Sequence, residues 1–434
     1  MNGVVALGPL PRIPSLFELE AEAIRERRNF HLVLALYIFR RRLQRKAKRF
    51  WVRPWIERRS FYGHYETLMG ELEREHQVDY VNYLRMEPAM FHELLTRLSP
   101  RLTKEDTKFR KALSAGLKLA VTLRYFATGM TFHDLSYDFR VPHNSISMLV
   151  KEVCEAIIEV YSDEVLVTPR TPEAWLEVAQ QYHQLWNFPH TLGALDGKHF
   201  AIKSPRKSGS LYHNYKGFFS IILLGLVDAE YKFLWVDVGI PGSNSDAGIF
   251  NDSILKEAME SQTLGVPDPD PLPGDDRPTP YFIVGDDAFA LKTWMMKPHS
   301  QRHLTHEQRI FNYRLSRARR IVENTFGILA HRFQLLLTTM QLPPENATRV
   351  VMACVTLHNL MRIRYPNLQN LALDVERADH NVVPGAWRDG RELPELRQGR
   401  RPTNPAVVAK NQRIYLTEYV NSDAGAVPWQ DSMI

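Results

Sequence analysis

Two apolar runs separated by only three residues constrain the fold of this chain more than any other feature. Residues 218–227 and 231–238 flank Asp228-Ala229-Glu230, a spacing typical of a β-hairpin. Residues 190–202 form a third predicted strand, and residues 281–284 form a short fourth one. These segments predict a sheet in the middle of the chain.

Helical patterns surround the predicted strands. Apolar residues recur at helical spacing between residues 61 and 165, and residues 306–332 and 350–362 are further predicted helices. Residues 267–280 contain six prolines in fourteen positions, which predicts a surface loop that is neither helix nor strand. From about Asp374 onward the chain is polar, and we expect a weakly structured tail.

Length and composition narrow the class of protein. The 434 residues predict two or three domains, since a domain has roughly 150 residues. A hydrophobic content of 44% and a charged content of 24% exclude wholesale disorder. Two cysteines are too few for a disulfide scaffold or a cysteine-based zinc site, so we expect a reduced, intracellular protein. Residues 32–39, eight apolar positions, fall short of the ~20 that a membrane span needs, and we expect neither a membrane span nor a secretory signal.

The net charge is unevenly spread. Residues 25–59 contain thirteen Lys or Arg and two acids, a net +11, whereas the whole chain carries +6 and the remainder therefore −5. Such a basic arm, with one helix through its middle, indicates a polyanionic partner, most commonly nucleic acid. The alternatives are a solvated helix or a nuclear localisation signal at residues 40–49.

Residues 114–160 have the pattern of a helix-turn-helix. A predicted helix over 114–127 ends at Gly129, a short helix over 131–139 begins with Thr131 as its N-cap, and a turn over 141–145 caps a third helix over 146–160. Modules of this kind place a recognition helix in the major groove of DNA. The alternative is an ordinary helical subdomain. The exposed DNA-binding candidates are His143, Asn144, Ser145 and Lys151.

Acidic residues lie in apolar surroundings at three places in the chain. Asp196 lies inside a predicted strand, Asp286 and Asp287 follow another strand, and Glu323 lies within the predicted helix over 306–332. Buried charges are costly unless a cation pairs with them, and three converging carboxylates would require a divalent metal such as Mg²⁺. Two such ions about 4 Å apart can activate water and stabilise the leaving 3′ oxygen in phosphodiester cleavage.

Each acid also has a simpler interpretation. Asp196 is compatible with a turn at a strand end, and Asp286 and Asp287 with solvated loop acids. Glu323 is compatible with an ion pair to Arg319 or Arg320 on its own helix. The basic residues near Glu323 could contact phosphates or form a solvated helix face. They are Arg314, Arg317, Arg319, Arg320 and Arg332, and Arg319 and Arg320 are the DNA-binding candidates among them.

Six short motifs occur in a fixed order over residues 193–359. They are GALDGKH at 193–199, YHNYKG at 212–217, PGSNSD at 241–246, VGDDAF at 284–289, RIVENTFG at 320–327 and LHN at 357–359. In these motifs the chain resembles the PIF/Harbinger superfamily of DDE transposases and the nuclease-like proteins domesticated from them. The helical region upstream is similar to the family's helix-turn-helix segment.

The resemblance implies an α/β fold with an RNase H-like mixed sheet flanked by helices. The expected domains are a basic arm (1–60), a helix-turn-helix-like region (61–165), the DDE nuclease domain (166–365) and a polar tail (366–434). Asp196, Asp286 and Glu323 match the catalytic, metal-binding triad, which implies Mg²⁺ or Mn²⁺ as cofactor. Since adjacent side chains of an extended chain point to opposite faces, we expect only one of Asp286 and Asp287 to meet the metals.

The resemblance also implies secondary sites and partners. Asp246 matches a recurring aspartate that caps a loop or serves as an auxiliary ligand, and His358 and Asn359 match a helix in which packing is the commoner role. DNA and a Myb-like DNA-binding protein are the implied partners, and the nucleus the implied location, with the cytoplasm as the alternative without that partner. Whether the chain forms a homo-oligomer stays open. We expect a metal-dependent DNA nuclease or transposase; the alternative is a catalytically silent nuclear protein that docks DNA or protein.

Overall fold

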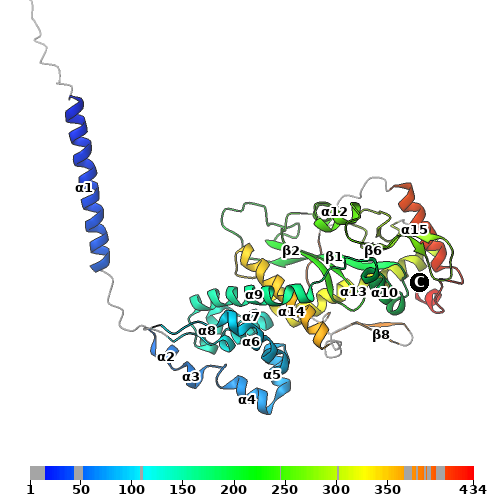
Figure 1. Cartoon of the computed structure of the whole chain (residues 1–434), viewed down its shortest axis with the longest axis horizontal. Helices are drawn as coiled ribbons and strands as arrows, with labels where there is room; N and C mark the ends of the chain where they lie inside the picture. The colour runs from blue at the N-terminus through cyan, green and yellow to red at the C-terminus, as the bar shows by residue number, and fades with distance from the viewer. Residues whose placement is uncertain are drawn as a thin grey trace, which may run out of the picture. The chain divides into compact units, whose positions relative to one another are not determined.

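The computed structural model describes residues 15–43, 52–107, 111–244, 246–300, 303–365, 374–377, 380–385, 388, 392–396 and 406–434 (Figure 1). The chain divides into two compact units, Met1–Pro54 and Trp55–Ile434. The first unit contains the helix α1 (Leu16–Leu43), whose side chains are exposed over residues 16–41. Most of the basic segment over 40–49 lies outside the described residues. No helix in the described part of the chain is long and apolar enough to cross a bilayer.

The N-terminal part of the second unit is helical, as predicted. Its helices are α2 (Pro54–Glu57), α3 (Arg59–Tyr62), α4 (Leu68–Glu75), α5 (Gln77–Leu84), α6 (Pro88–Leu102), α7 (Ala115–Thr128), α8 (Phe132–Phe139), α9 (His143–Val165) and α10 (Pro172–Trp186). Gly129 ends α7 in the left-handed conformation (φ 68°), which glycine adopts without strain. Thr131 begins α8 with a capping box, which confirms its predicted role as N-cap.

The third predicted helix begins earlier than the sequence indicates. We expected a turn through residue 145, but α9 begins at His143. The Pro142 carbonyl accepts hydrogen bonds from the amides of Ser145 (2.8 Å) and Ile146 (3.0 Å). Proline before the first turn fixes the backbone entering the helix, so His143, Asn144 and Ser145 form the first turn of α9 rather than a preceding loop.

A five-stranded mixed sheet lies at the centre of the second unit, in the order β3-β2-β1-β6-β7. The strands are β1 (Thr191–Ala201), β2 (Ser220–Val227), β3 (Phe233–Pro241), β6 (Phe282–Val284) and β7 (Met295–Met296). β2 and β3 form the predicted hairpin, β1 is antiparallel to β2, and β6 is parallel to both of its neighbours. The mixed α/β fold is therefore confirmed.

Helices pack against one side of this sheet. α13 (His306–Arg332) has the bounds that the sequence predicts, and α14 (Pro344–Arg364) extends beyond its predicted bounds at both ends. Shorter helices are α11 (Asp246–Asn251), α12 (Ile254–Glu260) and the 3₁₀ helices η1 (Gln334–Leu337) and η4 (Gln430–Met433). α10, α13 and α14 lie together along β1–β3, and α14 also packs along α9 (Figure 1).

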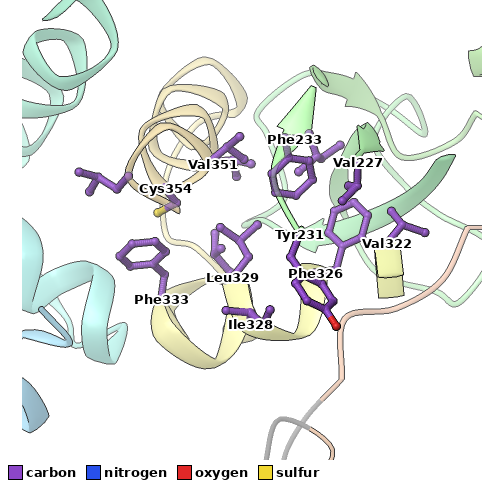
Figure 2. Close-up of a cluster of buried hydrophobic side chains, with 14 of the residues drawn as sticks. Val227, Tyr231, Phe233, Val322, Phe326, Ile328, Leu329, Phe333, Val351 and Cys354 are labelled. Carbon is purple, nitrogen blue, oxygen red and sulfur yellow. The ribbon is translucent and has the colours of Figure 1, made fainter. Parts of the chain in front are cut away.

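The core between sheet and helices is apolar and aromatic. Figure 2 shows Phe233 of β3 facing Phe326 of α13, and the two rings meet edge to face with their centroids 5.6 Å apart. Leu329, Phe333 and the α14 residue Cys354 continue this cluster towards the helical part. The core thereby fixes α13, which carries Glu323, against the strand that carries Asp196.

Two predictions about irregular segments are wrong. The proline-rich segment contains a pair of two-residue strands, β4 (Asp270–Pro271) and β5 (Pro278–Thr279), and so is not devoid of strand. The C-terminal part forms β8 (Val375–Glu376), β9 (Val382–Val383) and the helix α15 (Val407–Val420). α15 buries Leu416, Tyr419 and Val420 and packs against α13. Their helical spacing gives α15 an apolar face that the polar composition of the tail conceals.

Candidate active site

Asp196 lies in the middle of β1, the central strand of the sheet. Side chains two apart on a strand share a face, and Lys198 accordingly lies beside it, with Nζ 3.0 Å from Asp196 Oδ2. The two atoms are close enough for an ion pair, yet Oδ2 is buried and accepts no well-aligned hydrogen bond within the described part of the chain. That oxygen can therefore accept a further cation.

Asp286 lies two residues beyond the end of β6. Its Oδ1 accepts a hydrogen bond from the Ala288 amide at 3.0 Å, which closes a turn. Because the extended backbone has ended, Asp286 and Asp287 both line one cavity, and the expectation that only one of them meets the metals stays a prediction. Burial, followed by the nearby charge of Asp196, raises the pKa of Asp286. Asp287 pairs with Lys297, whose Nζ lies 3.1 Å from Oδ1.

Glu323 is paired with a cation on its own helix. Arg319, one turn earlier on α13, places a guanidinium nitrogen 2.6 Å from Glu323 Oε1. The simpler interpretation of Glu323 as an ion-pair partner is thus observed. Burial opposes the charge of Lys198, but the charges of Asp196 and Glu395, with a smaller contribution from Glu323, raise the Lys198 pKa.

Asp196, Asp286 and Asp287 line a cavity of about 230 Å³, and Glu323 is not among its lining residues. Its lining residues are Asp196, Asp286, Asp287, Pro298, Arg319, Glu395 and Leu396. Burial opposes the charge of Arg319, but four surrounding carboxylates outweigh burial and raise the Arg319 pKa. They belong to Glu323, Asp196, Asp286 and Glu395. The carboxylates are therefore close enough to share the same counter-ions.

The donor set agrees in chemistry with a hard divalent cation. Carboxylate oxygens are the ligands that Mg²⁺ and Mn²⁺ prefer, and Asp196 offers a buried oxygen without a hydrogen bond. Within the described residues, however, no three His, Cys, Asp or Glu side chains are grouped so that they could hold a metal ion. Lys198 and Arg319 occupy the acids instead, so Glu323 would have to release Arg319 to join the two aspartates.

The other predicted residues are distributed over the second unit. Residue 246 begins α11, but its side chain is outside the described part. At the N-terminal end of α9, the exposed His143 ring stacks on His133 with centroids 4.2 Å apart, and Asn144 is exposed while Ser145 is half-buried. Lys151 is also exposed and lies 3.8 Å from Glu155.

Two arginines of α13 have roles that the sequence does not indicate. Both interpretations, phosphate contacts and a solvated helix face, are wrong for Arg314 and Arg317, which are 2% and 4% exposed. Arg314 donates to the Gly425 carbonyl and to Gln430, and Arg317 makes a bidentate ion pair with Glu376. They hold C-terminal segments against α13. Arg320 is half-buried.

The motif at 357–359 is structural. Asn359 donates to the carbonyls of Val165 and Phe233, and its Oδ1 accepts from the Phe233 amide. His358 is fully buried beside the Tyr231 carbonyl (2.8 Å), and burial lowers its pKa to about 3. A neutral His358 donates to this carbonyl through Nε2. The packing role expected for both residues agrees with these contacts.

Three charged side chains at the site are not predicted from the sequence. The position of Lys198 could have been predicted, since it lies two positions after Asp196 on a strand and therefore shares its face of the sheet. Lys297 and Glu395 have none, because they approach the cavity from loops whose course depends on the whole fold.

Comparison with known proteins gives the class of this site. Residues 195–359, which include Asp196, Asp286 and Glu323, match the DDE superfamily endonuclease family. The chain therefore contains a DDE superfamily endonuclease domain.

The relatives narrow this class. Over 276 residues the chain is 26% identical to "Putative nuclease HARBI1" of Rattus norvegicus and 25% identical to that of Homo sapiens, covering 63% of this chain and 74% of each relative. It is 25% identical over 254 residues to "Protein ALP1-like" of Arabidopsis thaliana, covering 57% of this chain and 61% of the relative. No solved structure matches the chain. The resemblance to Harbinger transposase-derived nucleases is confirmed.

Proposed function

We propose that the chain is a metal-dependent DNA nuclease of the Harbinger type with an RNase H-like catalytic domain. The observation that carries the proposal is the convergence of Asp196 and Asp286 on one cavity. Burial and the charge of Asp196 raise the pKa of Asp286, so folding places these acids together against their own repulsion. Such arrangements are concentrated at functional sites. The names of the relatives and the matched endonuclease family support the same class.

Asp196, Asp286 and Glu323 are the residues that would hold divalent metal, Mg²⁺ or Mn²⁺. Bound there, the metal supplies activation of a water molecule and stabilisation of the leaving 3′ oxygen. The protein's own contribution is to fix one carboxylate on the central strand, one in the turn after β6 and a third on α13. Arg319 balances the charge of Glu323 until metal and substrate arrive, and Lys198 does so for Asp196.

DNA binding is assigned to the basic arm and to the N-terminal end of α9. His143, Asn144, Ser145 and Lys151 would contact DNA there, and the charge of the arm favours phosphate contacts. Arg319 and Arg320 would reach the phosphates at the cavity. A Myb-like partner and a nuclear location complete the proposal on family grounds.

Cleavage of labelled DNA tests the proposal. Wild type and Asp196→Ala are compared side by side in Mg²⁺ and in Mn²⁺, with and without a Myb-like protein. We expect metal-dependent cutting by wild type and a loss of at least about a hundredfold in the variant, as for removal of one catalytic group. Equal rates would refute the assignment of Asp196, and a folded wild type that binds DNA without cutting it would refute the nuclease.

One observation favours a second candidate function, a catalytically silent protein that docks DNA or protein. Lys198 and Arg319 already neutralise two of the three acids, so these two acids have counter-ions without metal. The two functions differ in their response to metal. A ligated site should raise the melting temperature when Mg²⁺ or Mn²⁺ is added, whereas a docking platform should not respond.

A further inference from the structure

The segment Glu392–Leu396 lies beside the catalytic strand. β6 pairs with β1 only as far as Ala194, so the edge of β1 beyond that residue, next to Asp196, lacks a partner from the sheet. Glu395 forms an isolated antiparallel bridge with Lys198 there, and the Pro394 carbonyl accepts from the His199 amide at 3.0 Å. We call residues 392–396 the edge segment.

The edge segment is fitted closely into this place. Leu396 is 6% exposed and lies against Gly197, where a Cβ would be 2.1 Å from Leu396 Cδ1. A residue with a side chain at position 197 would therefore force the Leu396 side chain to shift. The Tyr215 hydroxyl donates to the carbonyls of Glu395 (3.1 Å) and Leu396 (3.3 Å). The segment is held by backbone groups, one tyrosine and one buried leucine.

The edge segment also places a negative charge at the cavity. Glu395 and Leu396 both line it, and Glu395 Oε1 lies 3.7 Å from Lys198 Nζ. The Glu395 side chain is 74% exposed, so this pair contributes little to stability and is easily exchanged. The Lys198 side chain is 8% exposed and lies on the face of β1 that carries Asp196, with Nζ 3.0 Å from Asp196 Oδ2.

We propose that the edge segment is an internal occupant of the nucleic-acid groove, in which the Glu395 carboxylate stands where a substrate phosphate binds Lys198. This inference rests on the proposed function. A carboxylate and a phosphodiester are both anions that a lysine ammonium binds, so a DNA strand entering along β1 takes the place of Glu395. Lys198 then positions the phosphodiester beside Asp196, and the edge segment detaches from β1.

The test compares two glutamate variants of the full chain. Glu395→Gln and Glu392→Gln make the same change in net charge three residues apart, and Glu392 does not line the cavity. The affinity for a short labelled duplex is measured in EDTA, where metal-dependent cleavage cannot contribute. We expect Glu395→Gln to tighten binding by about threefold or more, as for one charge in a partly exposed pair, and Glu392→Gln to leave it unchanged.

A third variant separates the effect of holding the edge segment in place from the effect of the Glu395 charge. Tyr215→Phe removes the hydroxyl that holds the edge segment and leaves the net charge unchanged. We expect it to accelerate hydrogen exchange in residues 392–396 and at the His199 amide. In wild type, saturating DNA should produce the same acceleration, because the strand displaces the segment.

The outcomes distinguish this inference from the nuclease itself. If the two glutamine variants have equal effects on DNA affinity, the proposal that the edge segment occupies the groove is wrong. It is also wrong if the amides of the edge segment stay protected from exchange at saturating DNA. Neither outcome would bear on any cleavage that is observed. Tightening by Glu395→Gln alone, without cleavage in any metal, would support the occupant and overturn the nuclease. If no variant binds DNA, both proposals fail.

Discussion

Folding moves the Asp286 carboxyl out of water and next to Asp196, and both changes raise its pKa. A raised pKa in the folded state contributes stability that is present below the ordinary aspartate range and is lost as the pH rises through the folded value. At neutral pH the ionised Asp286 therefore destabilises the metal-free protein. We expect Asp286→Asn to raise the melting temperature in EDTA by roughly 1–2 °C.

The control for this prediction is Asp252→Asn, an exposed aspartate near α12, which should leave the melting temperature unchanged. Added Mn²⁺ should then stabilise wild type and Asp252→Asn but not Asp286→Asn, because the last lacks one of the three carboxylates proposed to hold the metal. A lower melting temperature of Asp286→Asn in EDTA would mean that Asp286 has a favourable partner and that its charge is not a cost of folding.

The residues of the site differ in how far the sequence predicts them. The meeting of Asp196 and Asp286 at one cavity could be predicted because their motifs are short and local, whereas Glu323 does not line that cavity and its place in the triad stays a prediction. The basic side chains that pair with these acids could not be identified from such local motifs. Arg319 and Arg320 are both within reach of Glu323 on the helix, and the three-dimensional arrangement selects Arg319, which also faces the cavity.

At the scale of elements, α13 is the helix that connects the site to the rest of the fold. It begins with a capping box in which the Thr305 side chain accepts from the Gln308 amide and the Gln308 side chain accepts from the Thr305 amide. We expect Thr305→Ala to lower the free energy of unfolding by about 1 kcal/mol, as measured by urea denaturation, because an amide in the first turn loses its acceptor. Thr305→Ser keeps the hydroxyl and should retain most of the stability; equal losses in the two variants would point to the methyl group instead.

Elements with a local code are predicted well, and contacts between distant segments are not. The α13 bounds and the β2–β3 hairpin follow from patterns within a few residues. The edge segment lies beside β1 because β6 ends early and Gly197 leaves room for Leu396. Tyr215 and Glu395 are 180 residues apart in the sequence, so no local pattern indicates that they meet. The sequence does not predict α15 for a related reason, since the role of its apolar face becomes clear only from its packing against α13.

At the scale of the whole molecule, the net positive charge lies in the first unit, whereas the sheet and the cavity lie in the second unit. Residues 1–54 carry a net +8, so the second unit carries −2. A second unit that is slightly acidic, with a cavity lined by carboxylates, has little long-range attraction for a polyanion. The basic first unit can supply that attraction while the second unit supplies the chemistry, which makes the two roles separable by deletion.

Deleting residues 1–54 should therefore change binding without changing folding. Because the second unit forms its own compact core, we expect its melting temperature to stay within about 1 °C of the full chain. DNA affinity should fall, and the slope of log affinity against log salt concentration should become shallower by about 0.9 for each DNA phosphate that the arm neutralises. Fluorescence anisotropy over a salt series measures both quantities. An unchanged salt slope would show that the arm does not bind DNA and would leave nuclear localisation as its role. A large fall in melting temperature would show instead that the arm stabilises the second unit.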